Sequence, residues 1–289
     1  MIDKRRFVMG SLALGACSVQ PAVTKIVDNS ALQSIEASLG GGRLGVAALD
    51  TASERWLLHR PDEKFAMCST FKLLLVANVL WSAAHGGAQL EDRVRYSDGD
   101  LLEYAPVTRA HVAEGAMTVE QLCEAAITLS DNTAANLLMP AVMGPEGLTR
   151  FLRSQRDPVT RLDRTEPTLN ENAANDIRDT TEPQAMARTM RALLLGDALT
   201  APLKEKLIGW MIACQTGDGR LRAGVPPDWR IGDKTGTGEN GAHNDIAIAY
   251  PPGHAPIIIA SLTSEGSADG DVRKAAHAAV ARAVVAAFS

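Results

Sequence analysis

The chain has 289 residues, of which 46% are hydrophobic and 22% are charged, a composition typical of a globular protein with a large core in one or two domains. Its formal net charge of -5, without a basic run after the first residues, argues against nucleic acid or an anionic membrane as the main partner. The four cysteines form no C-x-x-C pair, so we expect neither a disulfide framework nor a thiolate zinc site.

The first 24 residues are predicted to be an export signal. Three basic residues, 4–6, precede an apolar run over residues 7–16 that is too short to cross a bilayer. "KRRFVM" resembles a twin-arginine (Tat) signal, and "LGAC" resembles a lipoprotein box with Cys17 as the lipid site. We therefore expect an exported protein, periplasmic or secreted, with no transmembrane span. Lipid anchoring through Cys17 and cleavage to a soluble form both stay open.

The segments after the signal begin with a helix and two strands. "NSALQSIEASLGG" predicts a helix closed by glycines, and "RLGVAALD" and "RWLLHR" predict two strands joined as a hairpin. From residue 69 to residue 214 helical periods dominate. Two of these helices begin with the spacing of a capping box, Thr118 with Gln121 and Thr181 with Gln184.

The C-terminal part returns to strands, "WRIGDKTGTG", "NDIAIAY" and "PIIIASLTS", and ends in an Ala-rich helix that begins near Asp269. Both chain ends together predict an α/β domain, residues 25–61 and 213–289, with a five-stranded antiparallel sheet flanked by helices. An all-α domain, residues 62–212, would be inserted between its halves. This domain includes a long irregular loop at residues 158–181, and loops of that length are usually functional or disordered.

The motif "CSTFK" is the first of three polar clusters. It places Ser69 and Lys72 at i and i+3, on one face of a helix that is otherwise apolar. In the first turn the helix dipole favours negative charge near the serine, and a partly desolvated lysine could accept its proton. Alone the motif is weak, because an N-cap serine followed by a solvated lysine has the same spacing.

The other two clusters are "SDN", Ser130 to Asn132, and "KTGTG", Lys234 to Gly238. The first lies between two helical periods, where a short loop could expose a hydroxyl and an amide or could merely cap a helix. The second ends a strand, and its glycines would let a ligand approach the backbone beside a positive charge. A phosphate loop is excluded because no glycine directly precedes the lysine and a strand follows.

In this order, Ser-x-x-Lys, Ser-Asp-Asn and Lys-Thr-Gly resemble the penicillin-recognising serine acyltransferases, which include class A β-lactamases and penicillin-binding proteins. In "RTEPTLN", Glu166 and Asn170 resemble the class A element that holds the deacylating water in an Ω-shaped loop. The resemblance therefore implies a class A serine β-lactamase with the serine β-lactamase/transpeptidase-like fold. It also implies an ion pair between Arg164 and Asp179 at the neck of the loop, and a cis bond before Pro167.

The resemblance implies catalytic roles for five residues. Ser69 would be the nucleophile, with Lys72 and Glu166 as alternative bases for acylation. The backbone N–H groups of Ser69 and Thr237 would form the oxyanion hole. Ser130 would pass a proton to the departing lactam nitrogen.

The resemblance also implies how the substrate carboxylate is bound. Lys234 and Thr235 would hold it directly. Many class A enzymes add an arginine at the position where this chain has His243, and Arg220 matches the alternative site from which some members supply that guanidinium.

Four further residues match the family in the substrate cleft. Asn132 would bond the side-chain amide of the substrate, and Asn170 would hold the catalytic water with the loop glutamate. Asn136 matches a residue that orients this glutamate, and Tyr104 would flank the cleft.

The predicted function is hydrolysis of the β-lactam amide of penicillins, and of cephalosporins as well, through a serine acyl-enzyme that confers antibiotic resistance. We expect no cofactor and no metal, β-lactam antibiotics and a catalytic water as partners, and a monomer. Two alternatives stay open: a D,D-peptidase or transpeptidase on peptidoglycan stem peptides, and a β-lactam sensor that stays acylated.

Overall fold

The structure is a computed structural model that describes residues 25–288. The predicted export signal and the lipidation site at Cys17 lie outside the described residues. Within residues 25–288, no helix has the length and the apolar character needed to cross a membrane.

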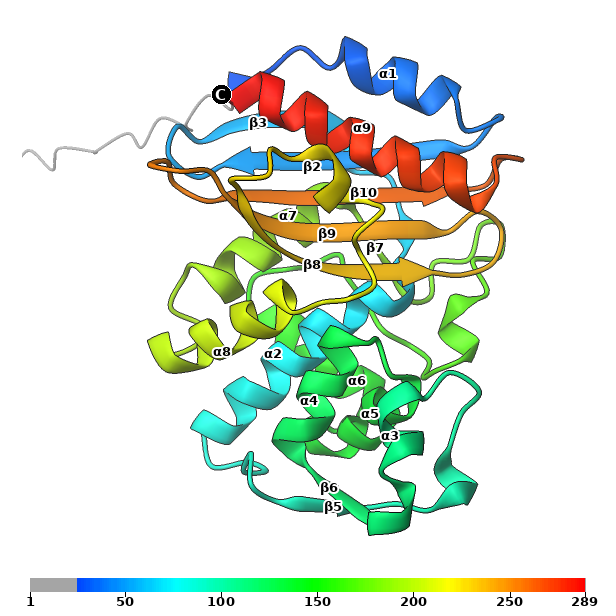
Figure 1. Cartoon of the computed structure of the whole chain (residues 1–289), viewed down its shortest axis with the longest axis vertical. Helices are drawn as coiled ribbons and strands as arrows, with labels where there is room; N and C mark the ends of the chain where they lie inside the picture. The colour runs from blue at the N-terminus through cyan, green and yellow to red at the C-terminus, as the bar shows by residue number, and fades with distance from the viewer. Residues whose placement is uncertain (1–24, 289) are drawn as a thin grey trace, which may run out of the picture.

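A six-stranded sheet forms the upper half of the molecule in Figure 1, with strand order β1-β3-β2-β10-β9-β8. Five of its strands pair antiparallel, as predicted. The sixth is the two-residue edge strand β1, which pairs parallel with β3 and was too short to be recognised in the sequence. The strands are β1 (Lys25–Ile26), β2 (Arg43–Asp50), β3 (Arg55–His59), β8 (Arg230–Thr237), β9 (His243–Tyr250) and β10 (Ile257–Ser264).

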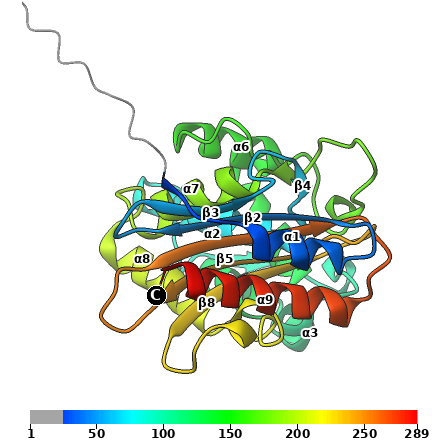
Figure 2. The same ribbon diagram turned by 90° about the horizontal axis from the view of Figure 1, so that it is seen from above.

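Helices cover both faces of this sheet, so its central strands are buried on both sides. Figure 2 shows α1 (Ser30–Ala37) and α9 (Gly270–Phe288) on one side, and α6 (Gly144–Ser154) and α7 (Pro183–Leu194) on the other. The two hydrophobic clusters follow the same division. A sheet buried on both faces explains why strands such as "PIIIASL" are continuously apolar rather than alternating.

Except for α1 and α9, the helices lie between β3 and β8 in the sequence, and most of them form the lower half of Figure 1. Their centre is α2, whose residues 71–80 are all buried. A helix that is apolar on almost every side needs neighbours around it. The helices that contact α2 (Phe71–Ala84) are α4 (Val119–Thr128), α5 (Asn132–Leu138), α6 and α8 (Ala201–Ile212), and α3 (Pro106–Ala110) packs against α4 and α5.

Short elements connect these helices. Two small antiparallel pairs join β4 (Phe65–Ala66) with β7 (Thr180–Thr181), and β5 (Arg93–Arg95) with β6 (Ala116–Thr118). The 3₁₀ turns are η1 (Cys68–Thr70), η2 (Asp98–Asp100), η3 (Val112–Glu114), η4 (Met139–Val142), η5 (Thr168–Asn170) and η6 (Leu221–Gly224).

One of the two predicted capping boxes is confirmed and the other is wrong. The hydroxyl of Thr118 accepts from the backbone N–H of Gln121, whose side chain accepts from the backbone N–H of Thr118. At the second position α7 begins at Pro183, which has no N–H to satisfy and already has a helical φ. Thr181 lies outside the helix in β7, and its hydroxyl is 2.7 Å from the hydroxyl of Thr160.

Candidate active site

Ser69 lies in η1, directly before the buried helix α2. The strand β8 passes close to it because residue 236 is glycine: a Cβ there would lie 2.8 Å from the carbonyl oxygen of Met67 and 3.2 Å from the nitrogen of Ser69. The side-chain amide of Asn244 donates to the carbonyl oxygens of Ala66 and Met67 at 2.8 and 3.0 Å. The sheet therefore fixes the chain that carries the serine.

Lys72 is fully buried one turn after the serine. Its ammonium donates to Ser69 Oγ at 3.0 Å and lies 3.0 Å from Glu166 Oε1. It also donates to the carbonyl oxygen of Ser130 at 2.7 Å and to Asn132 Oδ1 at 2.5 Å. Burial lowers the pKa of Lys72, against the opposing effect of the Glu166 carboxylate.

Glu166 points from the loop towards the serine. Its carboxylate is almost fully buried, and Oε1 accepts from Ser69 Oγ at 3.1 Å. Asn170 Nδ2 donates to the other oxygen at 2.6 Å. Asn136 holds the backbone of Glu166 in both directions, donating to its carbonyl oxygen at 2.9 Å and accepting from its N–H at 3.1 Å. The bond to Pro167 is cis, as the resemblance implied.

An ion pair closes the neck of this loop, as predicted. Arg164 Nε donates to Asp179 Oδ2 at 2.6 Å, and Asp179 is fully buried. The other oxygen of Asp179 accepts from the backbone N–H groups of Asp163 and Arg164 at 2.7 and 2.9 Å. The two ends of the loop are therefore joined by charge and by backbone contacts.

The Ser-Asp-Asn segment has both of the roles that its sequence left open: it caps a helix, and it presents polar groups to the cleft. Asp131 is the N-cap of α5, because its carboxylate accepts from the N–H of Ala134 at 2.8 Å. The same carboxylate accepts from the backbone N–H groups of Val107 and Thr108, both at 2.9 Å. Ser130 adopts a left-handed backbone with φ of 57°. The capping aspartate thus holds the turn from which Ser130 faces the cleft.

Lys234 on β8 is a second fully buried lysine. Its ammonium donates to Ser130 Oγ at 2.9 Å and to the carbonyl oxygen of Thr235 at 2.8 Å. Burial, together with the positive charge of Lys72, lowers the pKa of Lys234 to about 7.

Arg220 lies against the same strand and is also buried. Its guanidinium donates to the carbonyl oxygens of Gly236 and Asn244 at 3.0 and 2.6 Å, and to Thr237 Oγ1 at 2.8 Å. The neighbouring His243 is buried, and burial and Arg220 lower its pKa to about 3. His243 is therefore neutral at physiological pH, and the guanidinium of Arg220 supplies the positive charge here.

These residues surround a cavity of about 340 Å³. Tyr104 is half-exposed and forms part of its wall. The buried groups Lys72, Glu166 and Lys234 reach the cavity through the hydroxyls of Ser69 and Ser130. The lining residues are Ser69, Tyr104, Ser130, Asn132, Asn170, Thr216, Arg220, Thr235, Gly236 and Thr237.

Thr216 is the lining residue that the sequence did not reveal. Its hydroxyl is 2.6 Å from the hydroxyl of Thr235. No motif contains it, and only its nearness to the predicted Arg220 in the sequence hinted at a place in the site. Among residues 25–288, no three His, Cys, Asp or Glu side chains are grouped as a metal site would need.

Comparison with known proteins gives one consistent result. A family model described as "Beta-lactamase enzyme family" matches residues 29–288. Beta-lactamase AST-1 of Nocardia asteroides is 44% identical over 98% of this chain and 95% of that protein. Beta-lactamase L2 of Stenotrophomonas maltophilia is 44% identical over 98% of both chains. The solved structure of an ancestral (GNCA) class A β-lactamase superimposes with a TM-score of 0.88 at 56% identity, covering 90% of this chain and 99% of that one.

Proposed function

The chain belongs to the class A β-lactamases, and from that premise we propose how its own residues carry out the reaction. It hydrolyses β-lactam antibiotics, which confers resistance to them. The observation that carries the proposed mechanism is the position of Glu166, whose carboxylate oxygen Oε1 lies 3.1 Å from Ser69 Oγ and 3.0 Å from Lys72 Nζ.

In the acylation step, Ser69 Oγ attacks the carbonyl carbon of the lactam. Its proton goes to Lys72 or to Glu166, since both lie within hydrogen-bonding distance. The backbone N–H groups of Ser69 and Thr237 stabilise the oxyanion, and each such donor is typically worth about 10²–10³ in kcat. As the C–N bond breaks, the lactam nitrogen takes the proton of Ser130. Lys72, which receives the Ser69 proton directly or from Glu166 at 3.0 Å, then returns a proton to Ser130, whose Oγ lies 3.4 Å from Lys72 Nζ.

In the deacylation step, a water attacks the ester carbon. Glu166 takes a proton from this water. The amide of Asn170 contacts the carboxylate of Glu166 and holds the water in position. The ester bond to Ser69 then breaks, and Glu166 gives the proton that it took from the water to Ser69 Oγ, 3.1 Å away. General base catalysis of this kind contributes about 10²–10⁴ in rate.

The cations on β8 and beside it bind the carboxylate of the substrate. Arg220, Lys234 and the hydroxyl of Thr235 provide charge and donors at one end of the cleft. At the other end, Asn132 bonds the side-chain amide and Tyr104 contacts the exposed side of the substrate. A penicillin would therefore span the cavity with its lactam carbonyl at Ser69, and cephalosporins have the same two anchoring groups.

Export to the periplasm or the medium, with or without lipid attachment at Cys17, is part of the same proposal. It is supported by the basic and apolar pattern of residues 1–24. A monomer is part of the same proposal.

The Glu166→Ala variant tests the mechanism. It should still acylate with benzylpenicillin but accumulate a covalent adduct of the full mass of the drug, seen by mass spectrometry of the intact protein. Steady turnover should fall by about 10²–10⁴, the usual worth of a general base. Ser69→Ala is the control and should form no adduct. Unchanged turnover in Glu166→Ala would show that the loop carboxylate is not the deacylating base.

A further inference from the structure

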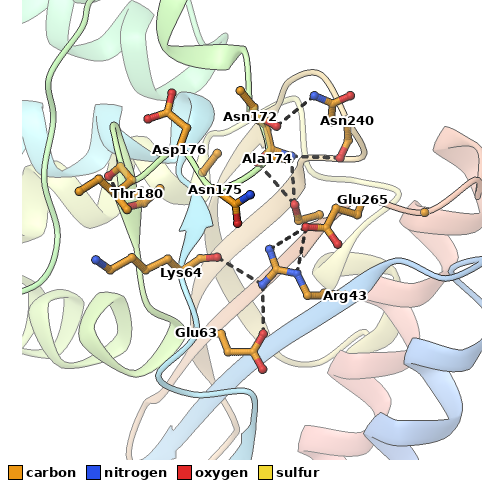
Figure 3. Close-up of a pocket in the computed structure, with 15 residues that line it drawn as sticks. Arg43, Glu63, Lys64, Asn172, Ala174, Asn175, Asp176, Thr180, Asn240 and Glu265 are labelled. Carbon is orange, nitrogen blue, oxygen red and sulfur yellow. Dashed lines mark hydrogen bonds and ion pairs between the residues drawn. The ribbon is translucent and has the colours of Figure 1, made fainter.

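A second cavity, of about 790 Å³, lies between the loop and the sheet, and the turn that joins β8 to β9 reaches its rim at Asn240 (Figure 3). Asn240 and Gly241 are the two central residues of this turn, in which the N–H of Ala242 donates to the carbonyl oxygen of Glu239 at 3.0 Å. Both central residues have positive φ, 46° and 73°, the pattern of a type I′ turn. This turn type favours the pair Asn-Gly, so the sequence here follows from the geometry of the hairpin.

Packing adds a second reason for glycine at position 241. A Cβ there would overlap the carbonyl oxygen of Glu265 and would lie 2.6 Å from a guanidinium nitrogen of Arg273. Position 240 is restricted as well, because its backbone is left-handed and asparagine tolerates that conformation better than most residues. Of all the asparagines in the chain, only Asn240 is followed by glycine. The fold therefore requires this dipeptide at a place where a larger residue could not follow Asn240 without displacing its neighbours.

An asparagine that precedes glycine is open to attack by its own main chain. The backbone nitrogen of Gly241 can bond to the side-chain amide carbon of Asn240, and the bond from that carbon to Nδ2 then breaks, so that ammonia leaves with the proton of the attacking N–H. Water opens the resulting succinimide ring at either carbonyl and gives aspartate or isoaspartate. The net reaction takes up one water, releases one ammonia and needs no other reactant. Glycine favours the attack because it has no Cβ to hinder the approach.

The structure leaves both reacting groups accessible. Asn240 is exposed and Gly241 is partly exposed. The N–H of Gly241 donates no hydrogen bond to any residue in the range 25–288. The amide of Asn240 donates to the carbonyl oxygens of Asn172 at 3.0 Å and Glu171 at 3.4 Å, but hydrogen bonds exposed to solvent contribute only modestly to stability. The amide can therefore leave these acceptors and turn towards the nitrogen of Gly241.

We propose that Asn240 is a site of spontaneous deamidation, which converts it to aspartate or isoaspartate through a succinimide formed with Gly241. Aspartate keeps the main chain of the turn, but its carboxylate cannot donate to the carbonyl oxygens of Asn172 and Glu171 and places a negative charge beside them. Isoaspartate in addition lengthens the main chain of the turn by one methylene group. The modification therefore destabilises the turn as the protein ages.

Peptide mapping of the wild-type protein tests the proposal. The folded protein is kept at about pH 7, 8 and 9 and then digested, and mass spectrometry after chromatography separates the asparagine, aspartate and isoaspartate forms of the peptide that contains residue 240. We expect the deamidated fraction to grow with time, at a rate that rises about tenfold for each unit of pH, because the attacking nitrogen must lose its proton and its pKa lies far above this range. An amide at Asn240 that stays intact for weeks at the highest pH would overturn the proposal.

Asn175 is the control within the same digest. Like Asn240 it is exposed and has a left-handed backbone, with φ of 60°, but Asp176 follows it instead of glycine. Its side-chain amide makes no hydrogen bond within residues 25–288, so a mobile amide alone would make Asn175 the faster of the two to react. We expect Asn175 to deamidate clearly more slowly than Asn240. Equal rates at the two positions would show that the glycine is not the cause and would refute the proposal.

The variant Asn240→Asp measures the effect of the aspartate product without ageing. Its Tm should be lower than that of Asn175→Asp, because both variants gain one exposed negative charge on a left-handed backbone, but only the first loses donated hydrogen bonds. Equal Tm values would refute the proposed effect on the turn. Neither measurement depends on the hydrolysis of a β-lactam, so the result stands apart from the proposed function.

Discussion

At the residue scale, two buried lysines share one hydroxyl. Ser130 Oγ lies 3.4 Å from the ammonium of Lys72 and 2.9 Å from that of Lys234. Both lysines have lowered pKa values because burial removes the water that would stabilise their charge. Lys72 has Glu166 as a counter-ion, whereas Lys234 bonds only neutral oxygens of Ser130 and Thr235. Lys234 is thus ready to receive the carboxylate of a substrate.

The pH dependence of substrate capture follows from this pKa. With its pKa lowered to about 7, Lys234 is charged below that pH and becomes neutral above it. Because kcat/KM reports the free enzyme, kcat/KM for benzylpenicillin should fall as the pH rises through about 7. A bound carboxylate stabilises the ammonium, so kcat should fall only at higher pH. Profiles measured between about pH 5 and pH 10 provide the test.

Lys234→Arg is the variant that isolates this group. A guanidinium stays protonated throughout the range, since its ordinary pKa is above about 12. The alkaline fall in kcat/KM should therefore move to higher pH in the variant, even if the activity at its maximum is lower. Coincident alkaline limbs for wild type and variant would assign the fall to another group.

At the scale of elements, α1 depends on a single carboxylate. The helix has eight residues and buries only Leu32, so its packing alone holds it weakly. Glu36 fastens it to the sheet: Oε2 accepts from Arg60 Nε at 2.6 Å and from the backbone N–H of Leu44 at 2.9 Å. His59 Nε2 lies 3.1 Å from the same oxygen. Chiefly because of Arg60, the pKa of Glu36 is lowered to about 2.

The lowered pKa of Glu36 predicts a contribution to the stability of the folded state that is lost at acid pH. A carboxylate whose pKa falls on folding stabilises the folded state above its ordinary pKa of 4.5. That contribution is lost as the pH falls from 4.5 through about 2, and below that pH Glu36 is protonated in both states. Glu36→Gln should therefore have a lower Tm than wild type at pH 7, and the difference should shrink between pH 4.5 and about 2.

Thermal unfolding of both proteins across this pH range measures the difference. Glu205→Gln, on the exposed surface of α8, is the control and should change Tm little at any pH. A Tm difference that is constant with pH would show that Glu36 acts through its shape and neutral hydrogen bonds rather than through its charge.

The elements could be predicted from the sequence where their patterns are local. The strand predicted at "NDIAIAY" and the box at Thr118 each depend on residues that are neighbours in the sequence, and both are confirmed. The wrong cap at Thr181 shows the limit, because a proline two residues later sets the helix start by itself. The strand β1 exists only through its pairing with β3, and two residues have no period of their own.

The sequence predicts those residues of the candidate site that lie in short motifs. Ser69, Ser130 and Lys234 each stand in one, and the fold brings these motifs to one cavity. Thr216 belongs to no motif that the sequence singled out, since its place depends on a contact with Thr235 on another segment of the chain. Its role follows from a distance that only the folded structure contains.

At the scale of the whole molecule, the cleft lies where the sheet meets the helices. Side chains of β9 alternate between the two hydrophobic clusters: Ile246 and Ile248 belong to the cluster on the helical side, and Ala247 and Ala249 to the other. Ser69 is carried by the helical part and Lys234 by the sheet. The apolar cluster between these parts therefore sets the distance between the nucleophile and the carboxylate site.

This arrangement bears on the proposed division into a sheet domain, residues 25–61 and 213–289, and an inserted helical domain, residues 62–212. One cluster joins helical residues such as Phe71 and Leu74 with Ile246, Ile248 and Ile258 of the sheet. Removing the sheet would expose the side chains that they cover, and each buried apolar side chain of this size is worth about 1.5–3 kcal/mol. We expect that the helical domain is continuous in sequence but does not fold on its own.

A fragment of residues 62–212 tests this expectation directly. It should keep helical far-UV circular dichroism, lack the near-UV signal of fixed aromatic packing, and bind the dye ANS through its uncovered apolar face. The intact chain under the same conditions should bind little dye. A fragment that unfolds cooperatively and gives a dispersed amide spectrum would show that the insert has a sufficient core. The sheet would then contribute to the site only by positioning β8, because the cluster shared through Ile246 and Ile248 would not be needed to hold Ser69 in place.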